Sequence, residues 1–229
     1  MQLSKIQEAV QAYTAWLGHL KDHPEAYWWE TVQTFQHHWN PEAADQADMF
    51  DRAIDNSVTR RPWQTEHWYP KRMMRLFWHT DPQTVRWMFD DLFNETKDPE
   101  ARIGRFLFGC DTLLADYRRA HPTQIENNHY HGDYRMIGLY LALRYPEAYA
   151  PYDFDAFQRT MAFLNARDLP RQNDLPRYNK VMRTLQTFID KEPRVQTHLD
   201  RLLDPRKHYT GKSLLPAADL CRNLERIVG

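Results

Sequence analysis

The chain of 229 residues lacks any long hydrophobic run. No segment approaches the roughly 18 consecutive apolar residues that a membrane-spanning helix needs, and the first residues lack the charged and apolar regions of a secretory signal. Cysteine is scarce as well. Cys110 and Cys221 each fall on the apolar face of an expected helix, which favours buried free thiols over a disulfide or a cysteine-based metal site. We therefore expect a cytoplasmic protein with no membrane partner.

Glycine is also rare, with 7 residues against 14 prolines, and the two-residue alternation typical of strands is missing. Apolar residues instead recur every three or four positions, as at Leu3, Ile6 and Val10. Prolines at 24, 41, 70, 82, 99 and 193 open new periodic segments, and three of them follow Asn40, Asp81 and Asp98, the order of a helix cap and a first helical proline. The pattern predicts an all-α bundle of ten to eleven helices, near 3–20, 24–38, 41–55, 70–79, 82–94, 99–119, 132–145, 153–166, 174–190, 193–203 and 213–227.

Charge is nearly balanced overall at −1 but is unevenly spread along the chain. Residues 1–157 hold 16 Lys and Arg against 23 Asp and Glu, whereas residues 158–229 hold 14 against 8. The sign changes within the proline-containing loop expected at 165–176; a second loop is expected at 56–69. We therefore predict a larger N-terminal bundle, 1–166, and a smaller C-terminal subdomain, 174–229, docked together or fused into one domain. A polyanion would meet the basic second part.

Two groups of cations are candidates for contacts with DNA phosphates. Arg177, Lys180 and Arg183 are three residues apart on the expected helix 174–190, so their charges form a stripe along one face. Lys71 and Arg72 stand together near the start of the expected helix 70–79. The alternative for both groups is an ordinary solvated face.

A cluster of four potential metal ligands lies within eight residues: Glu126, His129, His131 and Asp133. Zinc sites draw ligands from separated elements or from regular helical spacings such as two histidines four apart, and neither pattern is present. We interpret this segment as a polar loop that holds no metal. A metal-dependent hydrolase at 126–133 stays as the alternative.

Catalytic motifs are missing elsewhere too. The Thr210–Ser213 segment ends like a phosphate-binding loop, but the glycine required five residues before Gly211 is replaced by Arg206 and no strand is expected before it. A glycine turn with Ser213 capping the last helix is the simpler interpretation. There is no Gly-x-Ser-x-Gly elbow and no defensible carboxylate pair, so we expect no enzymatic activity and no cofactor.

Aromatic side chains make up 14% of the chain and have two interpretations. They could stack nucleic-acid bases, or they could fill gaps between helices, which is the commoner role. Trp28 and Trp29 are neighbours on an expected helix and point about 100° apart. We therefore expect one of these two rings at a surface.

Family resemblance appears in Asn128-His129-Tyr130, followed by Leu143-Arg144-Tyr145-Pro146. Together with the segments 29–39, 48–50, 69–74, 85–93, 102–103 and 209–215 in the same order, these residues resemble the helical N-terminal region that precedes the AAA+ motor in McrB-type restriction ATPases. The resemblance covers most of the chain, although His131 and Gly132 depart from the usual pair after His-Tyr. We count Asn128, His129, Tyr130, Arg135 and Arg144 as further candidates for contacts with DNA or a partner protein.

The resemblance implies a setting of modification-dependent DNA restriction or anti-phage defence. Its partners there would be DNA, an AAA+ motor and a McrC-type nuclease subunit, and the nucleotide-hydrolysing motor would lie outside this chain. We accordingly expect a non-enzymatic recognition or adaptor domain that binds DNA or a partner subunit. The alternative is a free-standing helical regulator that binds only protein.

Overall fold

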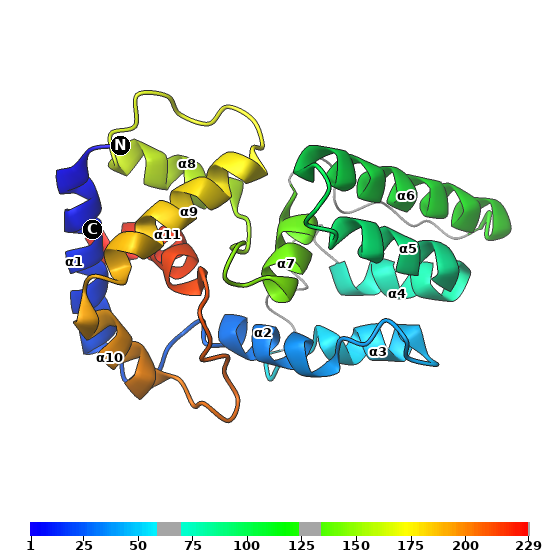
Figure 1. Ribbon diagram of the computed structural model, residues 1–229, viewed down its shortest axis with the longest axis horizontal. Coiled ribbons are helices and arrows are strands. Elements are labelled where there is room, and N and C mark those ends of the chain that lie inside the picture. Colours follow the sequence, from blue (N-terminus) through cyan, green and yellow to red (C-terminus); the bar gives the residue numbers. More distant parts are fainter. Residues whose placement is uncertain (59–69, 124–133, 229) are drawn as a thin grey trace. The chain divides into compact units, whose positions relative to one another are not determined.

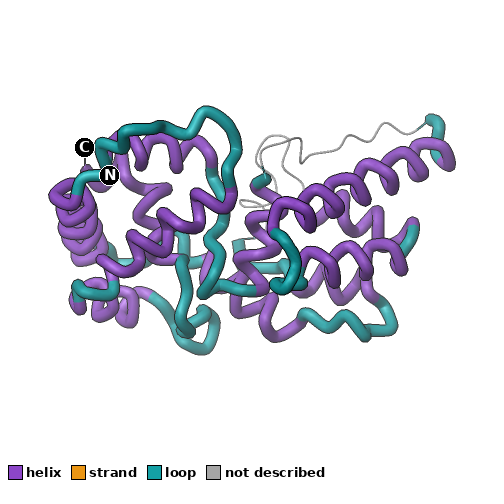
Figure 2. Tube along the Cα trace, turned by 45° about the horizontal axis from the view of Figure 1, so that its top comes forward, coloured by secondary structure: helices purple, strands orange, loops and turns teal. Residues whose placement is uncertain are grey.

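The computed structural model describes residues 1–58, 70–123 and 134–228, and these residues form helices and loops without a strand (Figure 2). This confirms the all-α prediction. The described helices are labelled in Figure 1 and are α1 (Leu3–His19), α2 (Tyr27–His38), α3 (Gln46–Ala53), α4 (Pro70–Thr80), α5 (Pro82–Leu92), α6 (Pro99–Ala120), α7 (Arg135–Arg144), α8 (Phe154–Phe163), α9 (Leu175–Ile189), α10 (Pro193–Leu202) and α11 (Leu215–Val228).

Helix starts follow the expected rule where an aspartate precedes the proline. Asp81 accepts a hydrogen bond from the Thr84 amide at 3.0 Å, and Asp98 accepts one from the Ala101 amide at 2.9 Å. Both carboxylates thereby satisfy amides that a helix N-terminus leaves unpaired. Pro82 and Pro99 occupy the first helical positions of α5 and α6.

The same rule is wrong at Pro24 and Pro41, where no helix begins. Asn40 accepts a hydrogen bond from the Glu42 amide at 3.0 Å, so its side chain closes a local turn instead of capping a helix. Helix α3 starts later, where Asp45 accepts from the Asp48 amide at 2.9 Å.

The chain divides into two compact units, and the division differs from the predicted one. Unit 1 comprises Met1–Gln33 and Asp133–Gly229, and unit 2 comprises Thr34–Gly132. Residues 164–174 do form a loop, as expected, but the helices on both sides of it pack on α11 within unit 1. The predicted boundary between 166 and 174 therefore falls inside one core.

Unit 1 is organised around α11, which packs against α1, α8 and α9 (Figure 1). Helix α1 also contacts α9 and α10, so the two ends of the sequence share one core. Unit 2 is built from α3 to α6, with α4 against α3, α5 and α6. In unit 2, the buried Asp91 on α5 receives two hydrogen bonds from Arg105 of α6, at 2.7 and 3.2 Å.

The paired tryptophans depart from the expectation that one would be exposed. Trp28 and Trp29 are both buried, at 7% and 2% exposure. The Arg222 guanidinium lies over the Trp28 ring, 4.7 Å from its centroid, while the Trp29 ring meets His23 edge-on at 4.9 Å. Each ring is covered by a different part of unit 1: α11 covers Trp28, and the segment before α2 covers Trp29. A pattern with one apolar face per helix does not predict this arrangement.

Cys110 and Cys221 are free and buried, as predicted. Burial raises the pKa of the Cys221 thiol to about 12, which leaves it unreactive near neutral pH. Among the described helices, none has the length and apolar character that would let it cross a bilayer.

Candidate nucleic-acid interface

Helix α9 separates an apolar inner face from a cationic outer face. Leu175, Tyr178, Val181, Met182 and Leu185 are buried in unit 1. The helix contains three cations and no Asp or Glu, and its first turn is closed by the Asp174 carboxylate, which accepts from the Arg177 amide at 2.9 Å. The outer face therefore carries charge of one sign along the helix.

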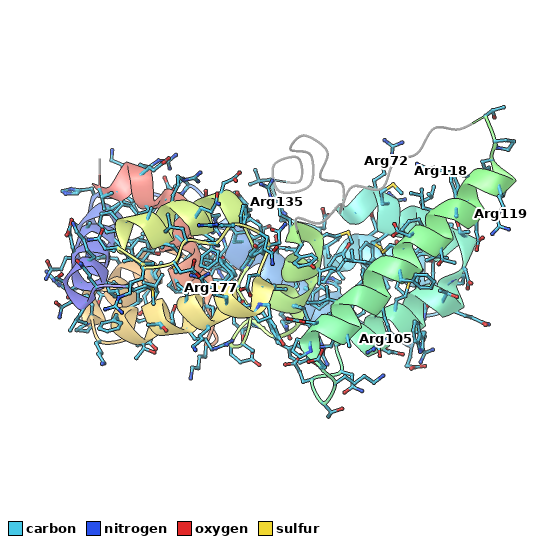
Figure 3. All side chains as sticks on the ribbon, turned by 90° about the horizontal axis from the view of Figure 1, so that it is seen from above. Arg72, Arg105, Arg118, Arg119, Arg135 and Arg177 are labelled. Atoms are coloured by element: carbon cyan, nitrogen blue, oxygen red, sulfur yellow. The ribbon has the colours of Figure 1, made fainter. Side chains whose placement is uncertain are left out.

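The three α9 cations differ in how far they are already engaged. Arg177, labelled in Figure 3, donates to the Asp168 carboxylate at 3.1 Å and to the Asp168 carbonyl at 2.5 Å, and its side chain is 27% exposed. Arg183 is exposed and donates one hydrogen bond to the Ala148 carbonyl at 2.9 Å. Lys180 is exposed, and its ammonium forms no ion pair with a described residue.

These contacts leave Lys180 and Arg183 as the groups most available to a phosphate. A carbonyl partner does not neutralise the Arg183 charge, and a guanidinium has donors to spare after one hydrogen bond. The Arg177 charge is balanced by the carboxylate of Asp168, which belongs to the loop before α9. Of the predicted stripe of three, Lys180 and Arg183 have no carboxylate partner among the described residues, and Arg177 has one.

Helix α7 brings two more predicted contact residues to unit 1. Arg135 lies 3.7 Å from the Asp155 carboxylate, and its side chain is 31% exposed. Arg144 is exposed, and its guanidinium stands 5.2 Å from the ring centroid of Tyr145. A guanidinium that lies over an aromatic ring retains its positive charge.

The predicted cations of unit 2 are in a different electrostatic setting. The Lys71 ammonium lies 3.4 Å from both Asp51 and Asp55, so two carboxylates compete for it. Arg75 also pairs with Asp51, at 3.3 Å. Arg72, on the same helix and labelled in Figure 3, is exposed. This local excess of carboxylates makes Lys71 a poor phosphate contact.

The net charges of the two units do not reproduce the asymmetry seen along the sequence. Unit 1 holds 18 Lys and Arg against 16 Asp and Glu, and unit 2 holds 12 against 15. The difference is small because the acidic segment 1–33 joins the basic C-terminal helices in unit 1. Any attraction for a polyanion must therefore come from a local face such as that of α9.

Asn128, His129 and Tyr130 lie outside the described residues, and so do Glu126, His131 and Asp133 of the alternative metal site. Within the described parts of the chain, no group of three or more His, Cys, Asp or Glu side chains is arranged to hold a metal ion.

A buried polar network in unit 1 was not anticipated from the sequence. The Asp219 carboxylate of α11 accepts from the Tyr13 hydroxyl at 2.7 Å and meets His23 Nε2 at 3.1 Å. The Glu25 amide donates to His23 Nδ1 at 3.1 Å, so Nδ1 carries no proton and Nε2 donates to Asp219. Arg222 joins the network through Glu25 at 2.8 Å.

The buried position of this network fits a role in stabilising the fold. The side chains of His23 and Asp219 are fully buried, and burial raises the pKa of Tyr13, with the Asp219 charge acting in the same direction. A neutral tyrosine without access to solvent is a poor acid or base. One signal was present in the sequence: Asp219 interrupts an apolar run between Ala218 and Leu220, where a charge must find a buried partner.

Comparison with known proteins adds no relative: no known protein family, no curated protein and no solved structure matches the chain.

Proposed function

We propose that the chain is a non-enzymatic recognition module that contacts DNA phosphates through the outer face of α9, within a restriction or anti-phage defence system of the McrBC type. The observation that carries this proposal is a helix of 15 residues with three cations and no carboxylate, of which Lys180 and Arg183 are exposed. Phosphate contacts of this kind position a protein on a duplex without reading its sequence. The resemblance to McrB-type N-terminal regions supplies the setting, including an AAA+ motor and a McrC-type nuclease as partners.

The test is a salt titration of duplex binding by the double variant Lys180→Ala/Arg183→Ala. Each lost phosphate contact should lower the slope of log affinity against log salt by about 0.9, so the double variant should lose up to about 1.8, equally for unmodified and cytosine-modified duplexes. Arg177 is left in place because it secures the loop at Asp168. The variant should melt at the parental temperature, since exposed charges add little to stability.

The matched control is Arg194→Ala/Arg206→Ala, which removes the same charge from unit 1. Both residues are exposed and pair with near neighbours, Arg194 with Glu192 and Arg206 with Asp204. If both double variants bind DNA with the parental slope, α9 is not the interface.

A second candidate function, binding to a partner protein, is favoured by two exposed aromatic side chains in unit 2. Phe108 on α6 is 74% exposed and Trp87 on α5 is 53% exposed. Exposed aromatic residues are enriched at protein interfaces. Absence of DNA affinity in the parent at low salt would favour this function, and Phe108→Ser with Trp87→Ser should then abolish capture of the motor or nuclease subunit.

A further inference from the structure

Unit 1 also contains a pocket whose lining does not include the three cations of α9. Its volume is about 490 Å³, inside the range of roughly 300–1,000 Å³ typical of small-molecule sites. Trp29, Leu199 and Pro216 line it with buried apolar surface. The side chains around these residues are polar and mostly exposed, so the pocket combines an apolar floor with a charged rim.

Two carboxylates of the rim are oriented by glutamines of their own helical turns. Gln186 donates to Asp190 Oδ1 at 2.7 Å, and Gln196 donates to Asp200 Oδ1 at 2.6 Å. Each contact uses one carboxylate oxygen and leaves the other for a further donor. Neither aspartate forms a salt bridge with a described residue.

The loop before α11 supplies the opposite charge. Lys212 is exposed on the rim, and it makes no salt bridge with Asp190, Asp200 or any other described residue. Beside it, Ser213 lines the pocket at 8% exposure, and its hydroxyl makes no hydrogen bond to the part of the chain that the structure describes. The predicted helix cap at Ser213 is therefore not formed; the Ala217 amide of α11 instead donates to Gln186 of α9 at 3.2 Å.

The Ser213 hydroxyl lines the pocket without a hydrogen-bond partner among the described residues. A ligand oxygen in the pocket would provide one. The rim carries Lys212 and two carboxylates with no salt bridge between them, which suits a ligand that carries both charges. A purely anionic ligand would face two carboxylates, and a purely cationic ligand would face Lys212.

We propose that this pocket binds a small zwitterion of the amino-acid class. Its ammonium group is held by Asp190 and Asp200, its carboxylate by Lys212 and the Ser213 hydroxyl, and its apolar part lies over Trp29. The proposed site is independent of DNA binding.

The test is isothermal titration of the full chain with each of the twenty standard amino acids up to about 10 mM, a range that covers weak sites. The best ligand is then compared with its amide, which lacks the carboxylate, and with its N-acetyl derivative, which lacks the ammonium. Each derivative should bind roughly tenfold to a hundredfold more weakly, the usual cost of losing a charge-assisted contact.

The variants assign each end of the ligand. Lys212→Ala should weaken the amino acid and leave its amide unchanged, while Asp200→Asn should weaken the amino acid and leave its N-acetyl derivative unchanged. Lys207→Ala is the control, an exposed lysine outside the pocket. The proposal is overturned if no amino acid binds, if the derivatives bind as well as the parent ligand, or if the pocket variants match Lys207→Ala. Unchanged amino-acid binding by Lys180→Ala/Arg183→Ala separates this result from the DNA proposal.

Discussion

The Asp219 carboxylate joins groups from distant parts of unit 1. Tyr13 and His23 reach it from the N-terminal segment, and the Asn223 side chain reaches it at 3.1 Å from the next turn of α11. Removal of this carboxylate would leave the Tyr13 hydroxyl and the His23 ring without their acceptor in a space closed to water. Buried polar groups that lose a charged partner are costly.

We therefore predict that Asp219→Ala lowers the free energy of unfolding by about 3–5 kcal/mol, the usual cost of breaking a buried charged contact. Urea denaturation at neutral pH measures it. Glu225→Ala on the same helix is the control, because Glu225 is 74% exposed and its one ion pair among the described residues is with the partly exposed Arg159, at 3.3 Å. That change should cost less than about 0.5 kcal/mol. Similar losses in the two variants would contradict a structural role for the network.

Among the helices, two glycines have opposite surroundings. A methyl group at Gly138 of α7 would lie 2.6 Å from the Tyr152 Cβ atom and 3.3 Å from the Tyr152 amide nitrogen. The helix can therefore approach this segment only because the side chain is missing. Gly104 of α6 is exposed, and an added methyl group there would meet nothing within 4 Å.

We predict that Gly138→Ala destabilises the protein by about 1–3 kcal/mol, because forced overlap in a packed core outweighs the better helix propensity of alanine. Gly104→Ala should stabilise it by about 0.5–1 kcal/mol, since only the propensity changes. Thermal unfolding of the two variants beside the parent tests the pair. Stabilisation by both substitutions would show that α7 tolerates a shift away from Tyr152.

Element boundaries were largely predictable because their causes are local. An aspartate before a proline fixes the start of α5 and of α6 within a few residues. The same rule was wrong at Pro41, where the Asn40 side chain closes a turn instead of capping a helix, and at Pro24, which no capping residue precedes. The cationic face of α9 was also visible in the sequence, but the partners of Arg177 were not, because Asp168 belongs to the preceding loop.

For the molecule as a whole, sequence patterns did not reveal which helices share a core. Tyr13 and Asp219 are separated by 206 positions, and periodicity contains no information about such pairs. The pocket beside Trp29 was missed for the same reason, since its walls come from α2, α9, α10 and the loop before α11. Charge counted along the chain was misleading because unit 1 combines both ends.

This arrangement predicts where the effect of a core substitution should appear. In Asp219→Ala, hydrogen exchange should speed up in α1 and α11, which pack together, whereas amides of α5 and α6 in unit 2 should keep the parental rates. Exchange followed by mass spectrometry resolves these helices. Uniform acceleration in all four would mean that the units unfold as one.

The shared core of α1 and α11 also imposes an order of events during synthesis. Residues 34–132 form a contiguous unit that can assemble once they have left the ribosome, but α1 must wait for α9, α10 and finally α11, which pack against it. At about 5–20 residues per second, the interval between Tyr13 and Asp219 lasts roughly 10–40 s. Throughout that interval the nascent N-terminal helix exposes the apolar face that α11 will later cover. Correct folding of unit 1 requires that this face make no lasting contact with other apolar surfaces before α11 is synthesised.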